Sequence, residues 1–259
     1  MLNHQNKRFS LLLLICALVW NVNVNAQKSY DIVARDIIDH ANELMRGNTS
    51  VSEMEMIITR PKWNRTLRFK SWSKGIDYSL IYVTYPAKEK GQVFLKRQKD
   101  MWNYMPDIEK MIKIPPSMMM QSWMGSDLTN DDLVKGASIV EDYQHIIIKE
   151  EEMDGYDCWV IELIPNEDAV VVWGKIICWV TKEGYMTLRN EYYDEDEYLV
   201  NIERLSKIKN VGDRLMPTFF EIVPSEKEGQ KTTMEFTEIK FNAPLNDSFF
   251  SIQNMKRIR

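Results

Sequence analysis

Beyond residue 47, apolar and polar residues alternate with a period of two in short runs that turn-forming residues separate. The alternation is clear over residues 54–58 and 66–70, and turn-forming pairs such as Asp154-Gly155 interrupt it. Because successive side chains of a strand point to opposite faces of a sheet, this period is typical of half-buried strands. Strands that recur about every eight to twelve residues indicate an antiparallel meander rather than a βαβ series. We expect a mainly β protein with about eleven strands, in a sheet that curves because flat open sheets of that size are unusual.

The segment before the strands has a different period. Over residues 30–46, apolar residues such as Ile37, Ile38 and Ala41 recur at spacings of three and four, which gives one apolar stripe. Gly47 follows, and glycine commonly ends a helix. We therefore expect one amphipathic helix ahead of the sheet.

Residues 117–135, which we call the central insert, also depart from the alternation and contain two helix-start signals. Ser117 is suited to cap a short helix that ends at Gly125. Thr129, with Asp132 three residues later, forms a capping-box-like start and predicts a second short helix. A curved sheet has a concave face to fill, and the N-terminal helix and the central insert are the candidates to fill it.

The N-terminus carries the pattern of an export signal. A pair of basic residues precedes the apolar residues 9–20, and small Ala26 follows an asparagine-rich stretch. An apolar run of this length is too short to span a bilayer and is typical of a secretory signal peptide. We expect a signal peptide over residues 1–26, cleaved after Ala26, and one exported domain over residues 27–259. An uncleaved anchor is the alternative interpretation.

The charge balance and the missing motifs argue against several function classes. Lys and Arg number 33 against 38 Asp and Glu, a formal net charge of −5, whereas nucleic-acid binding requires clustered positive charge. The sequence contains neither a Gly-x-Gly loop for a nucleotide cofactor nor a Gly-x-Ser-x-Gly nucleophile elbow. After the signal peptide only His40 and His145 remain, in an expected helix and an expected strand. We therefore expect no enzymatic activity, no metal, no cofactor and no nucleic-acid partner.

Two cysteines, Cys158 and Cys178, follow the expected signal peptide. They lie in two expected strands, and a hairpin centred on Asp168 would place them directly opposite each other. Direct cross-strand neighbours are within reach of a disulfide, which an oxidising compartment would allow. A bulge of one residue would separate them, so two free thiols are the alternative.

The central insert holds the densest group of large, flexible apolar side chains. Methionine is flexible and polarisable, so several methionines beside a tryptophan suit irregular apolar partners. Two interpretations stay open: a lid that lines a site for lipid or acyl chains, and a segment that only covers the core. Aromatic residues on the early strands suit the rim of a half-wet cavity, and equally a half-buried sheet. The candidate ligand-binding residues are Met118, Met119, Met120, Trp123 and Met124 of the insert, with Tyr82, Trp102 and Tyr104 of the strands.

Several short motifs resemble those of one known family. They are Trp63-Asn64-Arg65, Tyr85-Pro86-Ala87-Lys88-Glu89-Lys90-Gly91, Met101-Trp102-Asn103-Tyr104-Met105-Pro106, Ile112-Lys113-Ile114-Pro115 and Ser122-Trp123-Met124-Gly125-Ser126-Asp127. Together they resemble the outer-membrane lipoprotein-sorting proteins of the LolA/LolB-like superfamily, and the last motif is the most specific.

The resemblance implies an unclosed β-barrel whose helices form a lid over an apolar cavity. It also implies a periplasmic protein that binds lipid or lipoprotein acyl chains without covalent chemistry, for outer-membrane sorting. An RND-type inner-membrane transporter is the implied partner. The alternative function is an accessory protein of a transporter or of an envelope-assembly machine, with no lipid ligand of its own.

Overall fold

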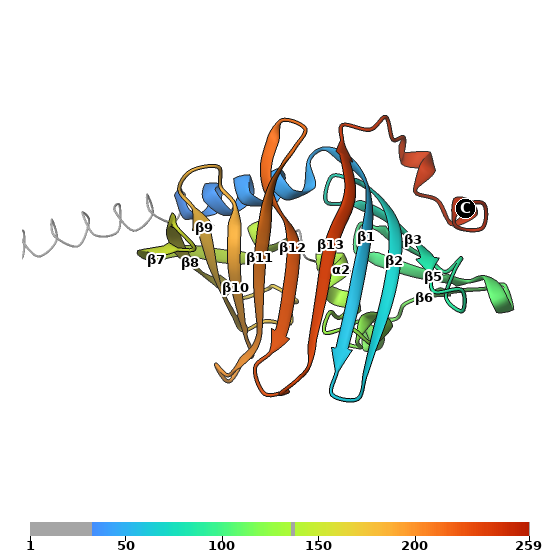
Figure 1. Ribbon diagram of the computed structural model, residues 1–259, viewed down its shortest axis with the longest axis horizontal. Coiled ribbons are helices and arrows are strands. Elements are labelled where there is room, and N and C mark those ends of the chain that lie inside the picture. Colours follow the sequence, from blue (N-terminus) through green and yellow to red (C-terminus); the bar gives the residue numbers. More distant parts are fainter. Residues whose placement is uncertain (1–32, 136–137, 259) are drawn as a thin grey trace, which may run out of the picture.

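The computed structural model describes residues 33–135 and 138–258, and one antiparallel sheet of thirteen strands dominates it (Figure 1). The mainly β class and the unclosed sheet are confirmed, with thirteen strands instead of about eleven. The three short segments expected as strands between residues 92 and 114 each pair in the sheet. The strands are β1 (Thr49–Arg60), β2 (Trp63–Lys74), β3 (Tyr78–Tyr85), β4 (Val93–Arg97), β5 (Asp100–Met105), β6 (Lys110–Lys113), β7 (Tyr143–Met153), β8 (Tyr156–Pro165), β9 (Lys175–Thr181), β10 (Thr187–Tyr193), β11 (Leu199–Val211), β12 (Arg214–Pro224) and β13 (Lys231–Phe241).

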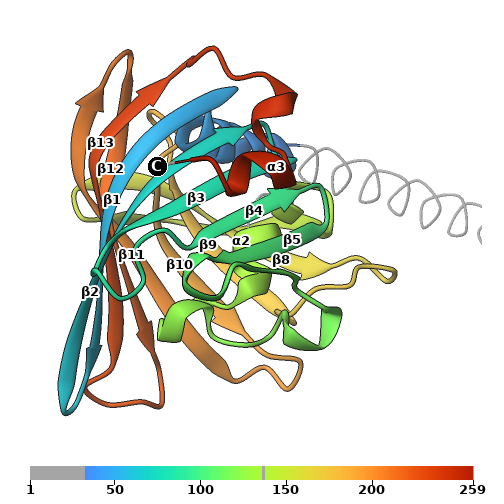
Figure 2. The same ribbon diagram turned by 90° about the vertical axis from the view of Figure 1, so that its right-hand side faces the viewer.

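The strand order is simple, because all strand pairs but one join strands that are consecutive in the chain, and β6 and β7 are the two edge strands. The order runs β6-β5-β4-β3-β2-β1-β13-β12-β11-β10-β9-β8-β7, so β1 and β13 join the two ends of the chain in the middle of the sheet. The expected tight turn between β7 and β8 is present, with Asp154 at φ 53° and Gly155 at φ 83°. Figure 2 shows the sheet curving around the central insert, and we call the side that faces the insert the inner face.

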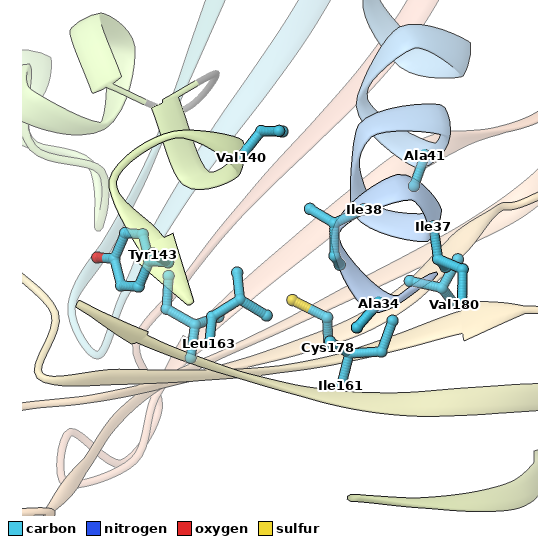
Figure 3. Packing of buried hydrophobic residues seen from close by; sticks show 11 residues of the cluster. Ala34, Ile37, Ile38, Ala41, Val140, Tyr143, Ile161, Leu163, Cys178 and Val180 are labelled. Carbon is cyan, nitrogen blue, oxygen red and sulfur yellow. The ribbon is translucent and has the colours of Figure 1, made fainter. Parts of the chain in front are cut away.

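The predicted N-terminal helix is present over the described residues 33–46. Its apolar stripe packs on the inner face, where Ile38 and Ala41 contact a cluster that includes Ile161 and Cys178 (Figure 3). The helix ends before Gly47, whose φ of +63° is not helical. Glycine suits this position also because an added Cβ would lie 2.7 Å from the Phe241 ring.

The second predicted helix of the central insert is confirmed as α2 (Asn130–Lys135). The Thr129 backbone N–H donates to the Asp132 carboxylate at 2.7 Å, and the Asp132 backbone N–H donates to the Thr129 hydroxyl at 3.1 Å. This reciprocal pair is the expected capping box.

The first predicted helix of the insert is wrong, because the chain folds back on itself there. Only two short 3₁₀ turns form, η2 (Pro116–Met118) and η3 (Trp123–Gly125). Ser122 pairs with Thr129 as an isolated bridge, and the Trp123 N–H donates to the Leu128 carbonyl at 2.7 Å. Met124 sits at φ 51°, which an α-helix cannot accommodate.

The C-terminal segment covers the opposite face of the early strands. After β13 it forms the 3₁₀ turn η5 (Asp247–Phe249) and the short helix α3 (Ile252–Met255). Phe250 and Met255 pack there against Leu80 and Leu95, all four fully buried. This region therefore has an apolar core on both sides of the sheet.

The predicted pairing of Cys158 with Cys178 is wrong, and both cysteines are free thiols. The β8–β9 ladder places Cys158 opposite Thr181 and Cys178 opposite Ile161, a register shifted by three residues from a hairpin centred on Asp168. An odd shift sends the two side chains to opposite faces of the sheet, where they join different apolar clusters.

The expected signal peptide and its cleavage after Ala26 lie outside the described residues. Within the part of the chain that the structure describes, no helix has the length and apolar character needed to cross a membrane.

Candidate ligand cavity

A cavity of about 310 Å³ lies on the inner face, between the N-terminal helix, α2 and strands β9 to β12. This volume is at the lower end of the ~300–1,000 Å³ range of ligand pockets. Of the four apolar clusters among the described residues, the one formed by the N-terminal helix with β8 and β9 contributes most to its wall. Figure 3 shows Ile38, Tyr143 and Cys178 of this cluster around the space beside the helix.

Most of the cavity wall is apolar. Ile38 and Met45 form its helix side, and Ile176, Phe220 and Ile222 form part of its sheet side. The sheet residues share one face because each strand contributes alternate positions, as the strand period predicts. Such a wall excludes water from an apolar chain and favours its binding through the hydrophobic effect.

Among the polar residues that line the cavity, three lie together on β10 and β11, and we call Asn190, Tyr192 and Glu203 the polar floor. Asn190 and Glu203 are directly opposite each other in the β10–β11 ladder. The Asn190 side-chain amide donates to Glu203 Oε2 at 2.8 Å, and the Tyr192 hydroxyl donates to the same oxygen at 2.9 Å. The carboxyl group is thereby fixed in position among apolar neighbours.

Burial raises the pKa of the carboxyl groups in and beside the polar floor. Desolvation raises the pKa of Glu203, and the hydrogen bonds from Asn190 and Tyr192 oppose that rise only in part. Desolvation also raises the pKa of Asp132 on α2, which lines the same cavity. The charge of Asp132 adds to the rise at Glu203, so the two carboxyl groups disfavour each other's ionised form.

The predicted ligand-binding residues of the central insert lie beside this cavity and do not line it. Trp123 is 3% exposed and packs against Phe69 and Phe94, with ring centroids 5.2 Å and 5.5 Å apart. Met119 and Met124 pack against the same cluster over β1 to β5. Met118 is half-buried in η2, and Met120 is 56% exposed.

The predicted aromatic residues of the strands lie on the other side of the sheet. Tyr82, Trp102 and Tyr104 belong to the cluster beneath the C-terminal segment, with Phe250 and Met255. Tyr82 is on this side because its neighbours Ile81 and Val83 face the central insert. The structure thus separates the eight predicted residues into two groups on opposite faces.

The family-like motif Ser122–Asp127 attaches the insert to the sheet. Asp127 pairs with Arg60 of β1 at 3.0 Å and accepts a hydrogen bond from the Thr232 hydroxyl of β13 at 2.7 Å. Both charged side chains are largely buried. Arg65 of β2 donates to the Met124 carbonyl at 3.0 Å. These contacts attach the insert to the sheet over the β1–β5 half of the inner face.

Sequence reasoning missed Asn190, Tyr192 and Glu203. Each sits at an ordinary alternating position of a strand, where a polar residue normally faces water. The useful signal was cross-strand register: with β10 and β11 aligned, Asn190 and Glu203 fall in one row with Cys178 and Ile222, which is otherwise apolar. A pair of polar residues in an otherwise apolar cross-strand row indicates a polar spot in the wall of a cavity.

A family model described as "Uncharacterized protein" matches residues 75–257, and the chain belongs to this family. Among solved structures it is similar to a DUF1329 family protein from Desulfovibrio piger ATCC 29098, with 26% identity, a TM-score of 0.80, and coverage of 87% of this chain and 99% of that one. No curated protein matches the chain.

Two further solved structures share the fold. A putative outer membrane lipoprotein-sorting protein domain from Vibrio parahaemolyticus is 22% identical, with a TM-score of 0.77 over 88% of this chain and 100% of that one. The LolA superfamily protein NE2245 from Nitrosomonas europaea is 23% identical, with a TM-score of 0.72 over 85% and 98%. The resemblance found in the sequence and the fold that it implied are confirmed.

Proposed function

We propose that the protein is a periplasmic carrier that holds an apolar chain of a lipid or lipoprotein in the cavity, without covalent chemistry. The observation that carries this proposal is the apolar cavity between the N-terminal helix, α2 and β9 to β12. The transfer of an apolar chain from water into such a cavity lowers the free energy of the system.

The comparisons support the proposal through the fold. One structure that shares it is described as a putative lipoprotein-sorting protein domain and another as a LolA superfamily protein. The expected signal peptide over residues 1–26 agrees with a periplasmic location. An RND-type transporter as the donor or acceptor partner rests on the family resemblance, and belongs to the proposal on that basis.

The central insert has a definite place in this mechanism. It includes α2, which brings Asp131 and Asp132 to the cavity wall. A movement of the insert would therefore move one wall of the cavity and widen it for a longer chain. In that open state Met118, Met119, Met120, Trp123 and Met124 would act as a lid and contact the ligand.

The test is lipid extraction from the purified protein, followed by mass spectrometry of the organic phase. Ala41→Phe should fill the cavity, because Ala41 is buried in its helix wall. The matched control is Asp36→Phe, which adds the same ring on the exposed face of the helix.

We expect the wild type and Asp36→Phe to carry lipid and to bind a fluorescent apolar probe, and folded Ala41→Phe to lose most of both. Equal lipid in the two variants would place the ligand elsewhere. If the wild type holds no lipid and binds no probe, the carrier proposal is overturned in favour of an accessory protein without a lipid ligand.

A further inference from the structure

The ionisable side chains that line the cavity carry only one sign of charge. Asp127, Asp131, Asp132 and Glu203 line it together with Tyr143, Tyr192 and Cys178, and none of the lining residues, all in the described part of the chain, is Lys, Arg or His. Asp127 is already neutralised by Arg60. Glu203 and Asp132 lie in a desolvated setting next to the space, and Asp131 is buried in the same wall.

The polar floor also offers an unused acceptor. Asn190 Oδ1 is buried and has no hydrogen-bond partner among the described residues. The amide nitrogen of the same side chain is bound to Glu203, which fixes the orientation of the oxygen. A buried acceptor without a partner is destabilising, and such atoms are rare in native structures. A donor on the ligand would remove this cost.

The acidic lining and the free acceptor favour some polar head groups of an apolar chain over others. A carboxylate or phosphate would have to enter an apolar space beside two carboxyl groups, without a cation to neutralise it. A hydroxyl group could donate to Asn190 Oδ1 and leave Glu203 protonated. A primary amine could donate to Asn190 Oδ1 and pair with ionised Glu203, a charge-assisted hydrogen bond and the stronger of the two contacts.

We infer that the cavity takes an amphipathic molecule whose apolar chain ends in a hydrogen-bond donor without negative charge, with a primary amine preferred to a hydroxyl group. The donor sits against Asn190 Oδ1 and Glu203, and the chain lies along Ile176, Phe220 and Ile222. This inference rests on the proposed carrier function and specifies its ligand.

The experiment is displacement of a neutral fluorescent apolar probe by decylamine, decanol and decanoate, each below its aggregation concentration. In the wild type we expect decylamine and decanol to displace the probe at concentrations about tenfold lower than decanoate, the effect of one satisfied buried polar group. Equal displacement by all three would overturn the inference and leave the carrier function intact. Displacement by none, with no probe binding, would overturn both.

Three variants separate the polar floor from the overall negative charge of the protein. Glu203→Gln keeps the shape and the acceptor oxygen, so decylamine should lose its advantage over decanol while decanol binding persists. Asn190→Ala removes the free acceptor and should weaken both. The control Glu228→Gln removes one charge in the exposed turn between β12 and β13 and should behave as the wild type. A full amine preference in Glu203→Gln would show that surface charge attracts the amine, and would overturn the inference.

Discussion

The two halves of the inner face differ in how completely they are filled. Over β1 to β5, Trp123 and the methionines of the central insert form a continuous apolar core with Phe69 and Phe94. Over β9 to β12, the N-terminal helix covers the sheet but leaves a cavity of about 310 Å³ with a polar floor. Both halves belong to one sheet with one strand period.

The cover explains the difference. The insert presents large, flexible side chains that fill irregular space, whereas the inward stripe of the N-terminal helix includes the small residues Ala34 and Ala41. The largest apolar side chains therefore mark the filled half, and the cavity lies where the cover is thin. In this protein the cluster of methionine and tryptophan marks the packed half of the inner face and not the cavity.

The largest expected effect is on the filled half. Trp123→Ala should lower the free energy of unfolding by about 3–5 kcal/mol, because a fully packed ring leaves a cavity behind. The measurement is urea denaturation followed by circular dichroism. Met120→Ala is the control, since this methionine is 56% exposed, and should stay within about 0.5 kcal/mol of the wild type. If Trp123→Ala lowered the free energy of unfolding only slightly, the insert would be loosely packed. The two halves of the inner face would then not differ in packing.

The attachment of the insert comes next. Asp127→Ala should cost about 3 kcal/mol, because it leaves the guanidinium of Arg60 largely buried without its carboxylate. The same denaturation experiment measures it. Glu55→Ala removes a carboxylate from the exposed pair with Arg68 and should cost less than about 1 kcal/mol. Equal costs would show that the insert is not held by the buried pair.

The hollow half should show a smaller, pH-dependent effect. The raised pKa of Glu203 means that the folded protein keeps this proton at a pH where the unfolded chain has lost it. Its contribution to stability is therefore present below the ordinary pKa of glutamate and is lost as the pH rises toward the folded-state value. Glutamine cannot titrate, so the melting temperature of Glu203→Gln relative to the wild type should rise as the pH increases above the ordinary pKa of glutamate.

A pH-independent difference between the two proteins would contradict this expectation, and Glu228→Gln is again the matched control. Asp132 has a raised pKa as well, but it is present in both proteins and largely cancels in the comparison.

The smallest expected effect concerns the two cysteines. Since Cys158 and Cys178 face opposite sides of the sheet, a reducing agent should leave the melting temperature unchanged. Alkylation of the denatured, unreduced protein, followed by peptide mass spectrometry, should find both thiols labelled. A peptide pair joined through these residues would contradict the β8–β9 register.

Local patterns were sufficient to predict much of the fold. The period of two located the strands, the stripe through Ile37, Ile38 and Ala41 located the N-terminal helix, and the pair Thr129 and Asp132 located α2. Each of these elements is determined by interactions between residues close in sequence. A short segment of the sequence is therefore enough to predict it.

The predictions that were wrong or missed concern features that depend on contacts between residues far apart in sequence. The β8–β9 register depends on how residues 166–174 fold as a loop, which shifted Cys178 to face Ile161. The missing helix at Met118–Met124 depends on a bridge from Ser122 to Thr129. The cavity needs four strands, a helix and α2 in place at once, and no single segment carries a sign of it. Long-range pairing therefore determines the site, while short-range pattern determines the elements.

The pairing of β1 with β13 has a consequence for how the chain folds. All other strand pairs join neighbours in sequence and close short loops, whereas Ser50 must find Phe241 across most of the chain. Closing so long a loop is entropically costly and slows folding. The N-terminal helix, made first, covers strands made much later, and β13 closes the sheet last. A nascent chain that still lacks its final strand can have two stacks of hairpins, but it has no complete cavity between them.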